Sequence, residues 1–208
     1  MDFFAARQIM VDSQVRVNDV TDHKLQKAMR TIARERLCAP SQSFCAYGEV
    51  EVEIAPHRVL MMVRDLAKIL QAVAPKAGET ALGLCAPYAS AVLADMQLHV
   101  SAVEAESRTL SVVEPYLHEL GVKTSCADLS ALTGQYDVII VEGAVSDMPQ
   151  AWFKALKEGG RLGVVVKSAR IGRAHMFTKR GGEIIDKALF DSPTSLIKGF
   201  EPKLGFVF

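Results

Sequence analysis

The feature that most constrains the fold of this chain is a regular alternation of short apolar runs with helical patterns, which begins near residue 78. Continuous apolar runs such as DVIIV and LGVVV are typical of strands that are covered on both faces. Strands that alternate with helices predict right-handed crossovers in a doubly wound, mostly parallel sheet of the α/β class. We therefore predict strands at 80–84, 98–103, 122–127, 136–141 and 161–166, with helices at 88–96, 106–120 and 149–157.

The segment before this alternation predicts mainly helices. Residues 3–17 can form an amphipathic helix, and a second helix is expected to follow Thr21 as its N-cap. Residues 49–55 alternate in polarity, which predicts a short half-exposed strand. Pro56 is placed at the first position of a long helix, whose apolar stripe reaches Val73.

The C-terminal third has a different pattern. Residues 172–178 and 184–190 flank the turn sequence KRGGE and predict a hairpin, and LGFVF at 204–208 predicts a last strand. We expect residues 1–76 to form an N-terminal helical extension that packs on the core. Residues 77–208 are expected to form the main domain.

The charge balance and the cysteines argue against several classes of protein. Lys+Arg and Asp+Glu both number 24, so the formal net charge is zero and provides no overall attraction to nucleic acid or to an anionic membrane. No apolar run approaches the ~18 residues of a membrane span, and the N-terminal residues do not resemble a signal peptide. The four cysteines form no CxxC pair and no zinc-ligand pattern with histidine, so we expect reduced thiols, no metal and a cytoplasmic location.

Two acidic residues follow predicted strands where an α/β sheet would bind a nucleoside. Such ligands lie beyond the carboxyl ends of the strands, where the strand order reverses. Glu104 follows Gly83 by about 20 residues, the separation expected between a glycine loop and an acid that binds ribose. Asp128, after the third strand, is placed to reach the edge of a base. Either acid alone is equally compatible with a surface carboxylate, but the two together favour a nucleoside site.

The composition of the loop after the first strand argues against a dinucleotide site. The loop reads Gly83-Leu84-Cys85-Ala86-Pro87, so a single glycine is available for positive φ. Pro87 fixes its own φ and has no N–H to donate. Without G-x-G-x-x-G, a pyrophosphate would lack its cradle of backbone N–H groups, which leaves a weakened nucleoside site as the expectation.

Several motifs together resemble one family. MVDSQ at 10–14, Ala28-Met29, Arg34-Glu35 and Pro40 are similar to the N-terminal signature of the protein-L-isoaspartate O-methyltransferases. The similarity continues through AVEAES, YDVIIVEGAVSDMP and LKEGGRLGVVV, and so covers most of the chain. The resemblance implies a seven-stranded, Rossmann-like, S-adenosylmethionine-dependent methyltransferase fold. It also implies methyl transfer to the carboxylate of isoaspartyl residues in damaged proteins or peptides, as protein repair.

The resemblance further implies which residues hold the cofactor. The loop would face its methionine part, Glu104 its ribose and Asp128 its adenine, while Glu142 and Gly143 would line the methyl-transfer cleft. The cofactor-binding residues implied in this way are Gly83, Leu84, Cys85, Ala86, Tyr88, Glu104, Ala105, Asp128, Leu129 and Glu142. No catalytic residue is implied.

The chain departs from the family pattern in two places. The glycine-rich loop is shortened, and its other glycines and its acid are replaced. In addition, GEVEVEIAPHR contains no Ser or Thr where the family has a hydroxyl-bearing loop that contacts substrate. His57 and Arg58 are placed to meet the substrate carboxylate instead, with a polar helix N-terminus as the alternative interpretation.

Two other functions compete with methyl transfer to protein. One is a non-catalytic methyltransferase-fold protein that acts as a scaffold or binding partner, its pocket partly filled by Leu84, Cys85 and Pro87. The other is a nucleic-acid or small-molecule methyltransferase, which has only the basic stretch 167–180 in its favour. A solvated hairpin face accounts equally well for that stretch.

Overall fold

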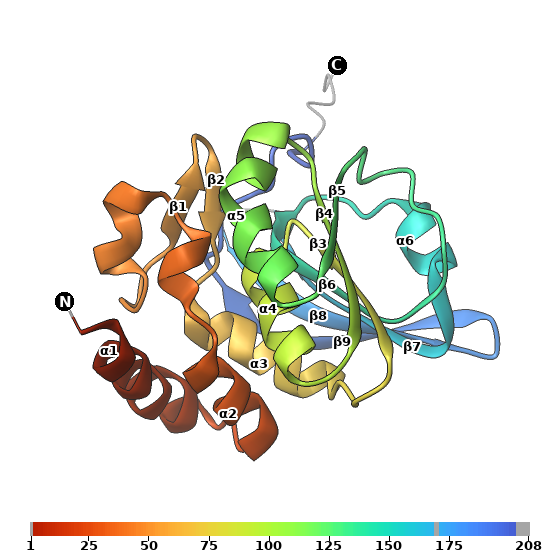
Figure 1. The fold of residues 1–208 in the computed structure, drawn as a ribbon. Coiled ribbons are helices and arrows are strands. Elements are labelled where there is room, and N and C mark those ends of the chain that lie inside the picture. The colour runs from red at the N-terminus through yellow and green to blue at the C-terminus, as the bar shows by residue number, and fades with distance from the viewer. Residues whose placement is uncertain (1, 169–170, 203–208) are drawn as a thin grey trace.

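The computed structural model describes residues 2–168 and 171–202 and is built around a seven-stranded sheet (Figure 1). The strands are β3 (Thr80–Leu84), β4 (His99–Glu104), β5 (Lys123–Cys126), β6 (Tyr136–Val145), β7 (Leu156–Val166), β8 (Gly172–Arg180) and β9 (Glu183–Ser192). Their order across the sheet is β5-β4-β3-β6-β7-β8-β9. β3 to β7 pair in parallel, and β8 and β9 add an antiparallel hairpin at one edge. The predicted α/β class with a mostly parallel sheet is confirmed.

Helices cover the two faces of this sheet. They are α1 (Phe3–Met10), α2 (His23–Thr31), α3 (Val63–Val73), α4 (Pro87–Asp95), α5 (Ser107–Glu119) and α6 (Gln150–Lys154). α3, α4 and α5 pack on one face, and α6 lies on the other side against β7 (Figure 1). The interior of β6 is buried from Val138 to its end, as expected for a strand covered on both faces.

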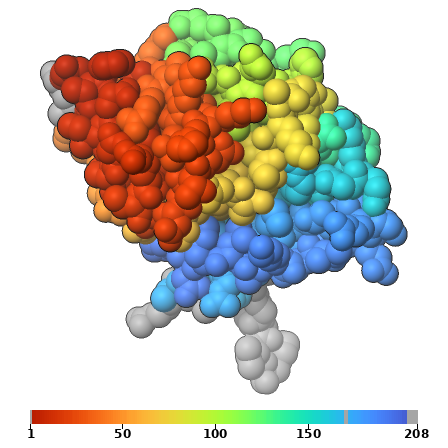
Figure 2. All heavy atoms as spheres, turned by 90° about the horizontal axis from the view of Figure 1, so that it is seen from below, coloured from red at the N-terminus to blue at the C-terminus, as the bar shows by residue number. Residues whose placement is uncertain are grey.

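The N-terminal residues form one continuous part of the surface, next to the segment that contains α3 and to the C-terminal hairpin (Figure 2). Their buried side chains, among them Met10, Leu25 and Met29, belong to the same apolar cluster as Leu66 of α3 and Ala91 of α4. Burial of this shared surface, rather than the intrinsic stability of short helices, therefore holds α1 and α2 in place.

The region around Pro56 is a hairpin, and the prediction of a helix that begins there was wrong. β1 (Val52–Ala55) pairs in antiparallel fashion with β2 (Arg58–Leu60), and His57 occupies the turn with a φ of 65°. An isolated strand would leave its backbone N–H and C=O groups without partners, so pairing across a two-residue turn is favoured over a helix here. α3 begins only after β2 has ended.

Two smaller predictions concern the ends of elements. The N-cap of α2 is Asp22 and not Thr21, because the Asp22 carboxylate accepts hydrogen bonds from the N–H groups of Lys24 at 2.8 Å and Leu25 at 3.1 Å. A carboxylate at that position also interacts favourably with the helix dipole. The last strand, predicted at 204–208, lies outside the described residues.

Candidate functional site

The carboxyl ends of β4, β3 and β6 meet where the strand order reverses, which is where α/β sheets bind ligands. β3 continues through a short turn into α4, β4 ends on Glu104, and β6 carries Glu142 near its end. Glu104 and Glu142 are both buried, with 3% and 0% of the residue surface exposed. A buried carboxylate is costly unless it is paired and hydrogen-bonded, so the partners of these two groups define the site.

The turn between β3 and α4 is packed closely against the helix. A Cβ atom at Gly83 would lie 2.0 Å from Ser90 Oγ and 3.2 Å from the carbonyl oxygen of Ala86, so glycine is required for this approach. The next residue with positive φ is Cys85, at 46°, and its N–H donates to the Val103 carbonyl at 2.8 Å. The glycine therefore serves the packing of helix on strand, and a cysteine occupies the left-handed position of the loop.

Glu142 is bound by the amino end of α4. Its Oε2 atom accepts hydrogen bonds from the backbone N–H groups of Tyr88 at 3.1 Å and Ala89 at 3.2 Å. The guanidinium of Arg34, itself fully buried, lies 3.9 Å from Glu142 Oε1 and 4.7 Å from the centre of the Tyr88 ring. Burial raises the pKa of the Glu142 carboxyl, against the influence of Arg34. The helix terminus that could bind an anionic ligand already holds a carboxylate of the chain.

Glu104 faces Arg58, which comes from β2. Arg58 Nε lies 3.6 Å from Glu104 Oε2, and the other guanidinium nitrogens donate to the carbonyl oxygens of Val59 and Cys85. Burial raises the pKa of Glu104, and the positive charge of Arg58 opposes that rise. Burial also raises the pKa of the adjacent Cys85 thiol to about 12, so this group is protonated at neutral pH. Arg58 and Glu104 thus form a buried ion pair on the β3 turn.

Very little space remains around the Arg58–Glu104 pair. The cavity beside the Arg58 guanidinium measures about 30 Å³. It is lined by Pro56, His57, Arg58, Cys85, Glu104, Ala105, Glu106, Thr109, Ile197 and Lys198. Pockets for ligands of nucleoside size measure roughly 300–1,000 Å³. A nucleoside has no room here while Arg58 lies against Glu104.

A segment near the C-terminus, residues 194–198, covers the same edge of the sheet, and we call it the strap. Within the strap, Ser195 accepts a hydrogen bond from the Ala144 N–H at 2.9 Å, and the Ile197 N–H donates to the Ala144 carbonyl at 2.8 Å. A Cβ atom at Gly143 would lie 2.6 Å from Ile197 Cγ1. The end of β6, where Gly143 is predicted to line a cleft, is therefore covered by the Ile197 side chain.

The residues predicted to contact adenine lie apart from this cluster. Asp128 is exposed, and its carboxylate accepts hydrogen bonds from the N–H and the hydroxyl of Ser130, both at 2.8 Å. It borders a separate open hollow of about 290 Å³ over β3, β4 and β5. Leu129 is buried, and its carbonyl accepts a hydrogen bond from Trp152 Nε1 at 2.6 Å.

The structure thus brings some predicted residues together and separates others. Arg58, Cys85 and Glu104 form one buried cluster, with Leu84, Ala86 and Tyr88 buried alongside them. His57 and Ala105 are exposed at its rim. The roles of all these residues toward a cofactor stay predictions.

Sequence reasoning missed two contributors, Arg34 and Ile197. Arg34 belongs to the N-terminal signature, but it lies in the charged stretch RTIARERL between Arg30 and Arg36, so no local pattern marks it as the buried one. Ile197 gave no signal, because it covers Gly143 from a distant segment of irregular chain. Arg58 was singled out as a substrate ligand, although it pairs with Glu104 of the chain itself.

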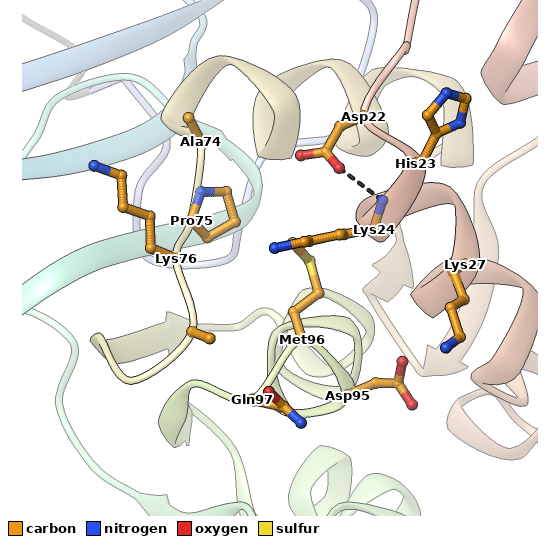
Figure 3. Close-up of a pocket in the computed structure, with 11 residues that line it drawn as sticks. Asp22, His23, Lys24, Lys27, Ala74, Pro75, Lys76, Asp95, Met96 and Gln97 are labelled. Atoms are coloured by element: carbon orange, nitrogen blue, oxygen red, sulfur yellow. Dashed lines mark hydrogen bonds between the residues drawn. The ribbon is translucent and has the colours of Figure 1, made fainter.

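Another hollow, of about 650 Å³, lies near the amino ends of the strands (Figure 3). It is lined by Asp22, His23, Lys24, Lys27, Ala74, Pro75, Lys76, Ala77, Asp95, Met96 and Gln97. Its lining carries both lysines and aspartates, so the hollow does not have a surface charge of one sign. One of the aspartates, Asp22, is already bound to the amino end of α2. Within residues 2–168 and 171–202, no group of three or more His, Cys, Asp or Glu residues is arranged to bind a metal ion. No helix in that same part of the chain is long and apolar enough to cross a membrane.

The sheet order, the helix that starts at the end of β3 and the acid at the end of β4 define a Rossmann-like fold of the S-adenosylmethionine-dependent methyltransferase class. Within that class, residues 6–192 match the family described as protein-L-isoaspartate(D-aspartate) O-methyltransferase. The chain belongs to this family.

Curated relatives agree with this assignment. A protein-L-isoaspartate O-methyltransferase of Koribacter versatilis is 27% identical over 194 residues, which cover 88% of this chain and 86% of that protein. A protein of the same name from Methylorubrum populi is 28% identical over 200 residues, or 93% of this chain and 94% of that protein. The similarity therefore spans both proteins almost from end to end.

Two solved structures show the same fold. One is a Plasmodium falciparum protein, described as a protein-L-isoaspartate O-methyltransferase in complex with S-adenosyl-L-homocysteine. It has a TM-score of 0.78 at 18% identity, over 92% of this chain and 98% of that chain. The other, titled protein-L-isoaspartate O-methyltransferase, has a TM-score of 0.75 at 22% identity, over 94% of this chain and 65% of that chain. At these identities the likeness concerns the fold alone.

Proposed function

We propose that this chain is an S-adenosylmethionine-dependent methyltransferase that methylates the carboxylate of isoaspartyl residues in damaged proteins. The observation that carries the proposal is the family match over residues 6–192. The S-adenosyl-L-homocysteine bound to the Plasmodium falciparum protein supports S-adenosylmethionine as the cofactor. All four cysteines are free thiols, which fits the reducing cytoplasm as the place of action.

The closed pocket does not fit that cofactor. The cavity at the ends of β3 and β4 measures about 30 Å³, and the acid predicted to bind ribose, Glu104, is paired with Arg58. The amino end of α4 is likewise engaged, by Glu142. Cofactor binding therefore requires the cluster to open.

Calorimetric titration of the wild-type protein with S-adenosylmethionine and with S-adenosyl-L-homocysteine tests the proposal. The proposed function requires saturable binding of both compounds. It further requires methylation of a peptide that contains isoaspartate, while the same peptide with normal aspartate is left unmodified. An absence of heat at millimolar ligand, or equal methylation of the two peptides, would contradict the proposal.

A second candidate function is favoured by one observation, the filled pocket. A methyltransferase fold whose Glu104 is paired with Arg58 is suited to act as a binding or scaffold protein without any cofactor. The same titration decides between the two candidates, because the second requires that neither compound bind. A tight complex with S-adenosyl-L-homocysteine would exclude it.

A further inference from the structure

We propose that Arg58 is a built-in competitor for the cofactor pocket, and that the β1–β2 hairpin and the strap form a latch that keeps it there. This inference rests on the proposed function, because it takes the S-adenosyl compounds as the ligands of the pocket. The side chain that such a ligand must displace is that of Arg58.

The first step of the argument is the match between Arg58 and its surroundings. Its guanidinium forms an ion pair with the Glu104 carboxylate at 3.6 Å and donates a hydrogen bond to the Cys85 carbonyl, and these are the groups that the end of β4 and the β3 turn offer to a ligand. The Arg58 residue is only 8% exposed, although its neighbour His57 is open to solvent. Arg58 therefore lies inside the pocket, as a ligand would, rather than at its rim.

The second step is that the hairpin carrying Arg58 is tied to the strap. Glu51, directly before β1, accepts hydrogen bonds from the Thr194 hydroxyl at 2.7 Å, from the Ser195 N–H at 2.7 Å and from the Ser195 hydroxyl at 2.5 Å. At the other end of the strap, Lys198 forms an ion pair with Glu106 at 2.8 Å. The two elements that close the pocket are thus held together by one carboxylate.

The third step is that the seam between these elements leads to solvent. An open hollow of about 530 Å³ lies outside the hairpin and the strap, and Val59, Ser195 and Leu196 are among the residues that line it. His57 and Lys198 line both this hollow and the small inner cavity. Movement of Arg58 and Ile197 would join the two spaces at the ligand-binding edge of the sheet.

Calorimetry with S-adenosyl-L-homocysteine on the full chain tests this latch. Arg58→Ala removes the competitor and frees Glu104, so we expect its Kd to fall at least tenfold below that of the wild-type protein. Arg173→Ala serves as the matched control and is expected to bind like the wild type, because Arg173 is an exposed residue of β8 whose partner is Asp191 of β9. Circular dichroism checks that each variant is folded.

A second variant keeps the test decisive if Arg58→Ala fails to fold. Glu51→Ala leaves the Arg58–Glu104 pair intact but releases the strap from the hairpin, so it is expected to tighten binding of S-adenosyl-L-homocysteine as well, by a smaller factor. A tighter Kd in either variant, with Arg173→Ala unchanged, supports the latch.

The outcomes also separate this inference from the proposed function. If the wild type, Arg58→Ala and Glu51→Ala bind equally well, the latch is refuted while the enzyme proposal survives. If the wild type, Arg58→Ala and Glu51→Ala all fail to bind S-adenosyl-L-homocysteine, the latch is refuted and the enzyme proposal falls with it. If Arg58→Ala binds but no preparation methylates the isoaspartyl peptide, the latch stands and the proposed function fails.

Discussion

At the residue scale, four buried charges determine what the site can bind. Arg34 and Arg58 lie within 4 Å of Glu142 and Glu104, respectively, and all four side chains are almost completely removed from solvent. Loss of one member would leave the other charged and unpaired in the interior, which costs several kcal/mol. Neither carboxylate is therefore available to a ligand until its arginine moves or is removed.

A polar cluster at the amino ends of β3 and β6 has a measurable pH dependence. Asp137 accepts hydrogen bonds from the N–H and hydroxyl of Thr80 and from Lys157 Nζ, at 2.7–2.8 Å. Burial acts to raise its pKa, but these bonds outweigh burial and lower it to about 2. Because the folded pKa is depressed, the stabilisation is present above the unfolded pKa of ~4 and is lost as the pH falls toward ~2.

Asp137→Asn is accordingly expected to lower the free energy of unfolding at pH 7 by roughly 1–2 kcal/mol. Urea unfolding at a series of pH values should show the gap between variant and wild type closing as the pH falls from ~4 to ~2. Asp147→Asn, at an exposed position, is the control, with an expected change within ~0.5 kcal/mol. A gap that is the same at every pH would contradict this account of Asp137.

At the element scale, the junction of β3 and α4 fixes the shape of the site. Gly83→Ala would place a methyl group 2.0 Å from Ser90 Oγ, so α4 must move away from the strand. We expect a loss of roughly 1–3 kcal/mol in the free energy of unfolding, measured with urea. Ser90→Ala removes the clashing atom and is expected to recover part of that loss in the double variant. If the two losses simply add, the proposed clash is absent.

The β1–β2 hairpin can be tested against the helix that the sequence predicted at the same place. His57 has a φ of 65°, which is strained for a residue with a Cβ atom and free for glycine. His57→Gly is therefore expected to leave the free energy of unfolding unchanged or to raise it by up to ~1 kcal/mol in thermal or urea unfolding. In the first turn of a helix the same change would lower it.

Sequence patterns predicted the parallel strands of the sheet and one of the two partners of the buried ion pair, Glu104. Continuous apolar runs located β6 and β7, because strands covered on both faces leave such a signal. β5, an edge strand with the sequence KTSC, has no apolar run, and its place followed from the alternation of strands with helices. Spacing alone singled out Glu104. It did not reveal that Arg58 pairs with Glu104, since Pro56 and the apolar residues after it fit a helix as well as a hairpin. The cover that Ile197 places over Gly143 depends on chain packing that no local pattern encodes.

At the scale of the whole molecule, closure of the pocket depends on segments far apart in the sequence. Residues 194–198 reach the ligand-binding edge of the sheet and bind Glu51 at the base of the hairpin. The fold of a methyltransferase is complete, and its pocket is closed by parts of the chain that lie outside the parallel strands. Family membership and the filled pocket are compatible if this closure is reversible.

A crystal structure of the wild-type protein grown with S-adenosyl-L-homocysteine tests the central claim most directly. The account predicts that the ligand lies at the ends of β3 and β4 with its ribose against Glu104, and that Arg58 has moved out toward the seam between hairpin and strap. Ligand bound at that place with Arg58 still paired to Glu104 would contradict it.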